Sequence, residues 1–313
     1  MGSRQERCLD EEALRLSREY RHVLGRERLD RLVARAFDMS RRTARTEISR
    51  GTVFVNGRRC QISSRWVLPG TVVRWDLEDG REPQPLRLRF LYENDEVWVV
   101  DKPPGIHVNR TQTTSRLSVA ERLGSHARVV HRLDLETSGV LLVAKTLSAA
   151  HRLSKLFQLR QVRKEYAALC VLSARHQLTS GDVTCRQPLG PDPRRPRAWS
   201  VRADGKASVT TLKLLGRCGD LALVEARPET GRTHQIRLHA QALGASVWGD
   251  LLYGGHATVR AGARVLTAPR VMLHARRLSF TLDGEEHAYT SPWPSDFLEG
   301  MRLTNPPAES WTD

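Results

Sequence analysis

The segment HRLDLETSG, residues 131–139, places one Asp, Asp134, in a short polar run between two apolar stretches. Thr137, Ser138 and Gly139 favour a compact turn, which would hold Asp134 at the beginning of the next strand. Catalytic side chains are often carried by loops at the ends of a rigid sheet. A lone Asp in a turn is more often structural, as an Asx-turn or a helix cap. Both interpretations stay open on these residues alone.

Tyr166 is a second candidate, in the run VRKEYAALC. Alternation predicts a strand over 162–171 with Lys164 and Tyr166 on the same face. A tyrosine ring stacks on a nucleic-acid base and a neighbouring Lys contacts phosphate. A tyrosine packed in the core explains the pattern equally well.

Arg237 is a third candidate, within GRTHQIRLHAQALG at 231–244. The pattern predicts a helix capped by Thr233 and ended by Gly244. A guanidinium in its first turn would pair with a carboxylate and hold it ionised, although a surface Arg is the simpler interpretation. His234 and His239 would lie about 140° apart on this helix, so they do not face one metal ion.

The composition points to an anionic partner. The chain has 313 residues, a formal net charge of +15 and five scattered Cys without metal-ligand spacing. A basic protein of this kind most often binds nucleic acid. No apolar run is long enough to span a membrane, and the N-terminus lacks a signal-peptide core. We therefore expect a cytoplasmic protein.

The segment 26–60 predicts a small basic unit. Apolar residues at helical spacing predict one amphipathic helix, and Ser40 is a plausible N-cap for a second helix that ends at Gly51. A β-rich run and an Asn56-Gly57 turn follow. The predicted RNA-binding residues are those of the second helix and the turn, namely Arg41, Arg42, Arg45, Arg50 and Asn56. A solvated basic face is the alternative.

The motifs RLDRLVA and SRRTARTEISRGTVFVNG resemble the ribosomal-protein-S4-like RNA-binding domain. The resemblance implies that the basic helix and the turn lie on RNA phosphates, where counterion release supplies affinity. The polar, Pro- and Gly-containing run EDGREPQP then marks a domain boundary. We predict an N-terminal extension, an S4-like domain, a linker, a catalytic domain and a tail, at 1–25, 26–77, 78–87, 88–300 and 301–313.

The motif series of the larger domain resembles that of the RluA-type pseudouridine synthases. The matching segments, in family order, are DKPPG, HRLDLETSG, RKEYAAL, GRTHQIRLHAQALG with VWGDLLYG, and LHARRLSF. The fold class that we expect is α+β, with a mixed, largely antiparallel sheet flanked by helices. Leu135 and Asp101 depart from the residues that the family commonly carries there.

The resemblance also implies roles for single residues. Asp134 would be the nucleophile that acts on the target uridine, by attack at C1′ or C6 or by a glycal route. Tyr166 would pack against the uracil and take the C5 proton, and Arg237 would form an ion pair with Asp134. Arg132 would enter the RNA stack when the uridine flips out. Lys102 and Lys164 complete the predicted RNA-binding set, and no metal or organic cofactor is expected.

The alternatives concern substrate and activity. The two-domain layout favours large-subunit (23S) ribosomal RNA, with transfer RNA second. A non-catalytic RNA-binding or ribosome-assembly protein predicts loss of Asp134, Tyr166 or Arg237, and all three are present. A DNA-binding protein would need a groove-reading helix or finger, which we do not find. Nothing suggests an obligate dimer, so we expect a monomer.

Overall fold

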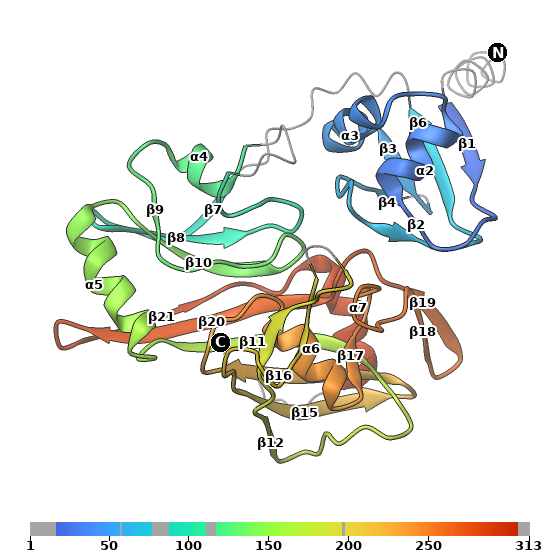
Figure 1. Ribbon diagram of the computed structural model, residues 1–313. Coiled ribbons are helices and arrows are strands. Elements are labelled where there is room, and N and C mark those ends of the chain that lie inside the picture. The colour runs from blue at the N-terminus through green and yellow to red at the C-terminus, as the bar shows by residue number, and fades with distance from the viewer. Residues whose placement is uncertain (1–16, 57, 77–87, 111–116, 196–197, 306–313) are drawn as a thin grey trace, which may run out of the picture. The chain divides into compact units, whose positions relative to one another are not determined.

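The chain forms two compact units (Figure 1). The computed structural model describes residues 17–56, 58–76, 88–110, 117–195 and 198–305. The first unit contains the described residues up to Asp76, and the second contains those from Leu88 onward. Some predictions fall outside the described residues. They concern the linker, Gly57 of the predicted turn, and most of the two terminal segments.

The first unit packs two helices against a small sheet. Its four-stranded sheet has the order β1-β6-β3-β4, and β2 pairs separately with β5. The elements are β1 (Ser17–Arg21), β2 (Glu27–Arg28), α2 (Leu29–Ala36), α3 (Arg41–Arg50), β3 (Val53–Val55), β4 (Arg58–Arg59), β5 (Trp66–Val67) and β6 (Val72–Asp76). Apolar side chains of both helices and of β3 and β6 form one buried core.

The predicted limits of the basic helix are confirmed. The Ser40 hydroxyl accepts a hydrogen bond from the backbone N–H of Thr43 at 3.0 Å, as an N-cap residue does. Gly51 ends the helix in the left-handed conformation, with φ of 84°.

Two elements of the units lie wholly or partly beyond the predicted domain boundaries. Ser17–Arg21 was expected in the N-terminal extension, but it pairs with β6 along its whole length and Tyr20 packs on the core. The predicted C-terminal tail begins at residue 301, but α7 (Ser295–Thr304) continues to Thr304, whose side chain is buried. In both places, strand pairing or core packing holds polar residues in the folded unit, although their sequence suggests a solvated extension or tail.

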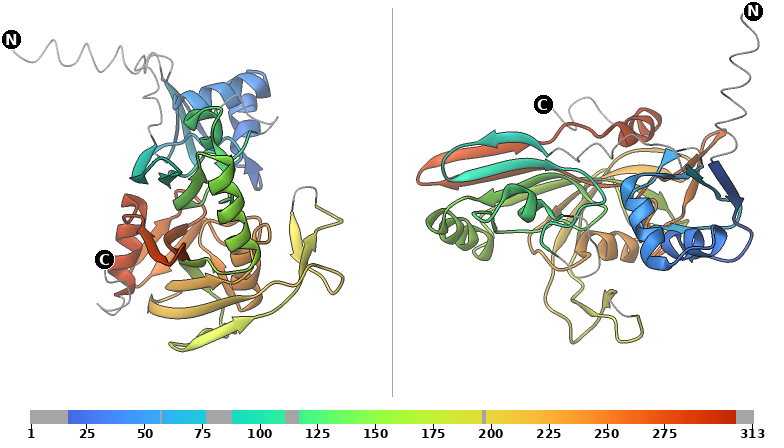
Figure 2. Two further views of the ribbon diagram at one scale, coloured as in Figure 1. Left: turned by 90° about the vertical axis from the view of Figure 1, so that its left-hand side faces the viewer. Right: turned by 90° about the horizontal axis from the view of Figure 1, so that it is seen from above.

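The second unit is built on an eleven-stranded sheet with the main order β12-β15-β16-β11-β20-β10-β8-β7, while β9, β17 and β21 pair beside it. Its strands are β7 (Arg89–Glu93), β8 (Val97–Lys102), β9 (Arg128–Val129), β10 (Ser138–Ala144), β11 (Arg163–Leu172), β12 (Asp182–Cys185), β15 (Thr210–Cys218), β16 (Leu221–Pro228), β17 (Ala245–Val247), β20 (Leu273–Leu282) and β21 (Glu285–Thr290). Two separate hairpins complete this unit. One pairs β13 (Leu189–Pro191) with β14 (Trp199–Val201) and extends from the unit in Figure 2. The other pairs β18 (Thr258–Ala261) with β19 (Arg264–Thr267).

Nearly all strand pairs of the large sheet are antiparallel. The exception among the described strands is β10 with β20, which run parallel over Ser138↔His274 and Gly139↔Ala275. The predicted α+β class with a largely antiparallel sheet is therefore confirmed. The parallel pair brings the loop that precedes β10 beside the segment that precedes β20.

Helices cover the sheet at both ends (Figure 1). They are α4 (Val119–Leu123), α5 (Leu147–Gln158), α6 (Gln235–Ala242) and α7. α5 packs near β9 and β10, whereas α6 and α7 pack near β15 and β16. On β11, Ala167 and Leu169 belong to the same core as Phe297 of α7. The alternate residues Lys164 and Tyr166 therefore point to the other face of the sheet.

Gly139 is required by the close approach of β10 to β20. Its φ is +116°, and a Cβ there would lie 2.1 Å from the carbonyl oxygen of Ala275. We predict that Gly139→Ala lowers the free energy of unfolding by at least about 3 kcal/mol, because backbone strain and overlap with a buried strand add together. Thermal and urea unfolding measure this change.

Gly284→Ala is the matched control. Gly284 also has a positive φ, +84°, but no atom lies within 4 Å of its Cβ position. Its replacement should cost only about 1 kcal/mol. Equal losses for the two variants would contradict the close-approach argument.

Candidate active site

The loop that carries Asp134 is bonded to two other segments of the chain. Lys102 Nζ donates to the carbonyl oxygen of Leu135 at 3.3 Å. Arg270 Nη1 donates to the carbonyl oxygen of Glu136 at 3.0 Å, and the Glu136 carboxylate accepts from the backbone N–H of Val271 at 2.9 Å. These bonds join the loop to the end of β8 and to the start of β20, so Asp134 stands on a fixed backbone.

Lys102 is not an RNA contact, and that prediction is wrong. Its side chain is fully buried, and Nζ also donates to the carbonyl oxygens of Pro103 and Ile106, at 2.9 and 3.1 Å. Burial lowers its pKa to about 7. Lys102 therefore serves the loop that carries Asp134 and has no access to a ligand in solvent.

Helix α6 supplies Arg237. The helix begins after His234, which adopts a left-handed conformation with φ of 58°, so the predicted Thr233 cap is wrong. The side chain of Gln235 fixes the preceding loop instead. Its Oε1 accepts from the Thr230 hydroxyl and from the Arg232 N–H at 2.6 and 3.0 Å. A buried amide thus takes the place of the hydroxyl cap.

Arg237 joins two carboxylates. Its Nη1 donates to Asp134 Oδ2 at 3.3 Å, which confirms the predicted ion pair. Its Nε and Nη2 donate to the two oxygens of Asp250 at 2.6 and 2.8 Å. The guanidinium also lies 4.8 Å from the centre of the Tyr253 ring. Arg237 is only 8% exposed, so the paired carboxylates are what make its burial tolerable.

Asp134 is held in its ionised form. Burial by itself raises the pKa of Asp134, but the charges of His234, when protonated, and of Arg237, and the hydrogen bond from Arg237, together lower it below its ordinary value. Burial lowers the pKa of His234, so this imidazole is neutral near pH 7. Arg237 is thus the cation in contact with Asp134 that is charged at all relevant pH values.

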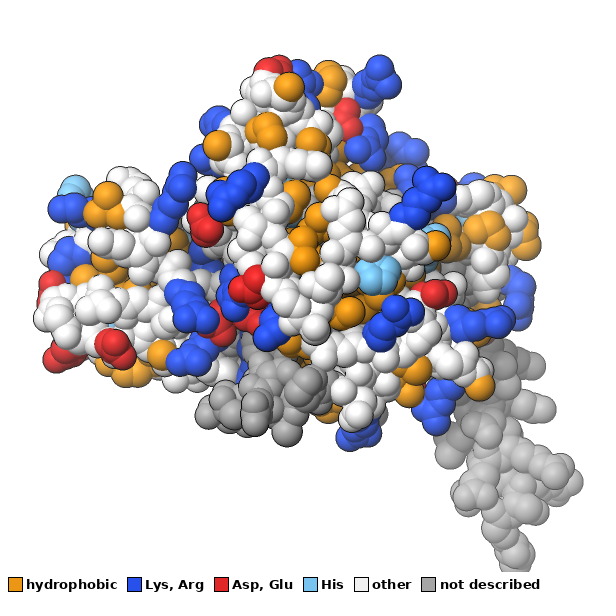
Figure 3. Space-filling model, turned by 90° about the horizontal axis from the view of Figure 1, so that it is seen from below, with side chains coloured by type: hydrophobic (Ala, Val, Ile, Leu, Met, Phe, Trp, Pro, Cys, Tyr) orange, Lys and Arg blue, Asp and Glu red, His pale blue; other side chains and the backbone are white. Residues whose placement is uncertain are grey.

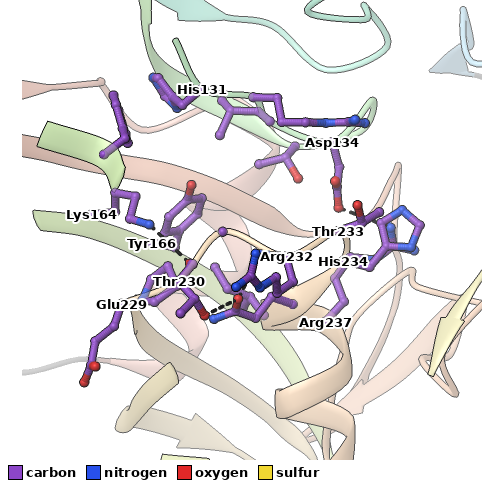
Figure 4. Close-up of a pocket in the computed structure, with 18 of the residues that line it drawn as sticks. His131, Asp134, Lys164, Tyr166, Glu229, Thr230, Arg232, Thr233, His234 and Arg237 are labelled. Atoms are coloured by element: carbon purple, nitrogen blue, oxygen red, sulfur yellow. Dashed lines mark hydrogen bonds and ion pairs between the residues drawn. The ribbon is translucent and has the colours of Figure 1, made fainter. Parts of the chain in front are cut away.

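A cavity of about 390 Å³ opens beside Asp134. Tyr166, Lys164 and Arg132 line it together with Asp134 and Arg237. Figure 4 shows the Tyr166 ring in the cavity, with its hydroxyl toward the loop of His131 and Asp134. The predicted common face of Lys164 and Tyr166 is therefore confirmed. The volume lies within the range of small-ligand sites.

Burial sets the proton state of the other groups in the cavity. Burial, and secondarily the charge of Asp134, raises the pKa of Tyr166 well above its ordinary value. Burial lowers the pKa of Lys164 to about 8, and its Nζ donates to the carbonyl oxygen of Thr230 at 3.2 Å. The Tyr166 phenol is therefore protonated at neutral pH.

Reasoning from the residues alone missed Asp250 and Tyr253 as parts of the site. The Tyr253 hydroxyl lies 2.6 Å from His234 Nδ1 and accepts from the backbone N–H of Trp199 at 2.9 Å. The segment VWGDLLYG looked like a loop in sequence, and its two polar side chains were the available signal. Their function depends on contacts with α6 that no local pattern encodes.

The described part of the chain contains no group of His, Cys, Asp and Glu side chains arranged to hold a metal ion. It also contains no helix that is both long enough and apolar enough to cross a membrane.

The first unit presents its own arginines. Asp30 is fully buried and forms ion pairs with Arg28, Arg41 and Arg45 at 3.1, 3.0 and 2.9 Å. Burial, the largest single effect, raises the pKa of Asp30, but hydrogen bonds from the three arginines outweigh it and lower the pKa. Arg41 and Arg45 bind Asp30 through Nε and are 41% and 38% exposed, so each guanidinium is fixed with one edge toward solvent.

The other predicted RNA-binding residues of this unit lie at its surface. Arg42 and Arg50 are exposed, and Arg50 pairs with Glu47 at 3.2 Å. The Asn56 side-chain oxygen accepts from the backbone N–H of Val72 at 2.8 Å. Asn56 therefore shapes its turn, and its contact with RNA stays a prediction.

Comparison with known proteins places these features in one family. A family model described as RNA pseudouridylate synthase matches residues 96–242, and an S4 domain model matches residues 27–73. Ribosomal large subunit pseudouridine synthase D of Vibrio cholerae is 33% identical over 295 residues, which cover 87% of this chain and 90% of that protein. The Neisseria meningitidis protein of the same name is 34% identical over 302 residues, which cover 88% of this chain and 79% of that protein.

A solved structure agrees. Human RNA pseudouridylate synthase domain containing 1 matches with a TM-score of 0.53 and 30% identity, over 66% of this chain and 84% of that one. The motif series, the fold and the relatives agree, and the chain belongs to the RNA pseudouridylate synthase family, with an S4 domain ahead of its catalytic domain.

Proposed function

We propose that the protein isomerises specific uridines of large-subunit (23S) ribosomal RNA to pseudouridine. The N1–C1′ bond breaks, the uracil turns, and C5 bonds to C1′. The C5 hydrogen leaves as a proton and N1 gains one, so the reaction needs no oxidant or reductant. The observation that carries the proposal is an ionised Asp134, bonded to Arg237, at a cavity that Tyr166 lines.

Asp134 is the proposed nucleophile. A carboxylate that forms a covalent intermediate divides one difficult step into two easier ones. The lowered pKa of Asp134 keeps it ionised at neutral pH. Its 21% exposed side chain faces the cavity, so a ribose or a uracil ring can reach it. Attack at C1′, attack at C6 and a glycal route remain the three alternatives.

Tyr166 is proposed to pack against the flipped uracil. Its raised pKa disfavours the phenolate, and a protonated phenol is a poor base. Packing is therefore the role we favour over removal of the C5 proton. The exposed Arg132 is proposed to enter the RNA stack in place of the uridine, because the reacting atoms are inaccessible within a helix.

The substrate class rests on several observations. The relatives named above are ribosomal large subunit enzymes. The net charge is +15, and Lys and Arg side chains spread over the face shown in Figure 3, where Asp and Glu are fewer. The arginines fixed by Asp30 are proposed to bind phosphates of the same RNA. That the protein acts as a monomer in the cytoplasm stays a prediction from the sequence.

Asp134→Asn tests the chemistry. We expect wild-type protein to release tritium from 5-tritiated uridine in a 23S ribosomal RNA transcript, and the variant to lose at least about a thousandfold in rate, because the amide is not a nucleophile. RNA affinity, measured by filter binding, should stay within about threefold of wild type.

Transfer RNA transcripts form the second arm of this experiment. Tritium release from transfer RNA, without release from 23S ribosomal RNA, would identify transfer RNA as the substrate class. RNA binding with no release from either RNA would favour the non-catalytic RNA-binding or ribosome-assembly interpretation.

Asp250→Asn tests how Arg237 is held. One of the two short bonds to Arg237 is lost, so we expect kcat to fall roughly ten- to a hundredfold with KM little changed, because small displacements at a reacting centre are costly. Asp283→Asn is the control, since Asp283 is 66% exposed and pairs with Arg152 at the surface. A change in KM alone would contradict the positioning role.

The pH dependence tests the electrostatics. Because the pKa of Asp134 is lowered, we expect the acid limb of the wild-type single-turnover rate below the ordinary carboxyl value near pH 4. The double variant Arg237→Gln with Asp250→Asn removes the cation but keeps a neutral hydrogen-bonding pair. Without the charge of Arg237, burial is the main effect on Asp134 and raises its pKa. The acid limb of the rate profile should therefore move to higher pH. An unmoved limb would refute the role of Arg237.

A further inference from the structure

Helix α5 ends in an unusual way at Arg160. The N–H of Gln161 donates to the carbonyl oxygen of Leu156 at 2.9 Å, and the N–H of Arg160 donates to that of Phe157 at 3.2 Å. This pair of bonds is a Schellman motif, whose left-handed position is usually Gly. Here that position is Arg160, with φ of 59°. An L-residue with a side chain is strained in this conformation.

Nothing in the described fold accounts for the Arg160 side chain. It is exposed, and its guanidinium has no hydrogen bond or ion pair among the residues that the structure describes. A favourable interaction with the negative end of the helix dipole is available to any cation in the last turn, including Lys155, which needs no strained backbone. Helix stability alone therefore does not explain an Arg in place of Gly.

Arg160 lines the cavity of the active site. Its helix end reaches the cavity beside His131, whose ring stacks on Phe157 with centroids 4.7 Å apart. Lys164 follows on β11, and Figure 4 shows His131 and Lys164 on the side of the cavity away from His234 and Arg237. The end of α5 thus belongs to the wall remote from the catalytic ion pair.

Basic side chains outnumber acidic ones around the cavity, and neither Arg160 nor Lys164 forms an ion pair with an acidic side chain among the described residues. The described residues that line the cavity include five basic side chains, Arg132, Arg160, Lys164, Arg232 and Arg237, and two acidic ones, Asp134 and Glu229. Asp134 is already paired with Arg237. An exposed guanidinium at such a wall matches the geometry of a phosphate and has more to gain there than in solvent.

We propose that Arg160 binds a backbone phosphate of an RNA nucleotide next to the flipped uridine. The proposal rests on the proposed function and adds a binding residue to it. The strained backbone directs the side chain to the cavity wall, where a nucleotide adjacent to the target passes. Because the contact is remote from the reacting atoms, it contributes to RNA binding and leaves the chemical step unchanged.

Four variants test this proposal: Arg160→Gln, Arg160→Gly, Arg160→Lys and Lys155→Gln. The affinity of each for a 23S ribosomal RNA transcript is measured between 50 and 300 mM salt, with single-turnover tritium release at saturating protein. For Arg160→Gln and Arg160→Gly we expect affinity to fall roughly three- to tenfold and the slope of log K against log salt to decrease by about 0.7 to 0.9. Arg160→Lys should retain the slope.

Lys155→Gln is the matched control, since Lys155 is an exposed cation of the same helix that does not line the cavity. We expect it to change neither affinity nor slope. Arg160→Gly should unfold at the same or a higher temperature than wild type, because Gly relieves the strain. Weaker RNA binding by a protein of unreduced stability would support the phosphate contact.

Three results would overturn the proposal. The first is an unchanged salt slope in Arg160→Gln. The second is a loss of RNA affinity in Lys155→Gln equal to that in Arg160→Gln. The third is a lower rate at saturating protein in Arg160→Gln with unchanged RNA affinity. Binding is measured separately from turnover, so the proposed function can fail alone. A wild-type protein that binds the 23S transcript without tritium release would refute isomerisation of that RNA, and the salt slopes would still decide the role of Arg160.

Discussion

The buried guanidinium of Arg237 is the constraint on which the site depends. A charge that is 8% exposed needs partners, and here two carboxylates from different segments supply them. The loop of Asp134, helix α6 and the loop of Asp250 must therefore meet at one point. The planar fork of Arg suits this task, because it binds Asp250 through two nitrogens and still reaches Asp134 through a third.

The sheet makes this meeting possible. The parallel contact of β10 with β20 aligns the loop before β10 with the segment before β20, where Arg270 and Glu136 join them. Arg270 also pairs with Asp296 of α7, at 2.7 Å. The helix that covers the core near β11 is thus linked to the backbone that carries Asp134. Packing on one face of the sheet therefore supports the walls of the cavity on the other face.

Basic residues have two roles in this protein: some hold buried groups, and others are exposed to a ligand. The net charge does not distinguish these roles. Lys102, Arg237 and Arg270 are buried and hold backbone or carboxylate groups. Arg132 and Arg160 are exposed at the cavity, and neither bonds through its side chain to another residue within the described part of the chain. Arg41 and Arg45 combine both, because Asp30 orients them at the surface. An excess of positive charge indicates an anionic partner, and only burial and pairing identify the residues that can meet it.

The sequence by itself determined the family, the α+β class and the candidates Asp134, Tyr166 and Arg237, because local motifs and alternation carry that information. The cap at Ser40 and the common face of Lys164 and Tyr166 were predicted for the same reason. Only the tertiary structure decided that Lys102 is buried, that α6 starts after His234, and that Asp250 and Tyr253 complete the site. Those outcomes depend on which distant segments pack together in the buried interior. A local sequence pattern does not contain that information.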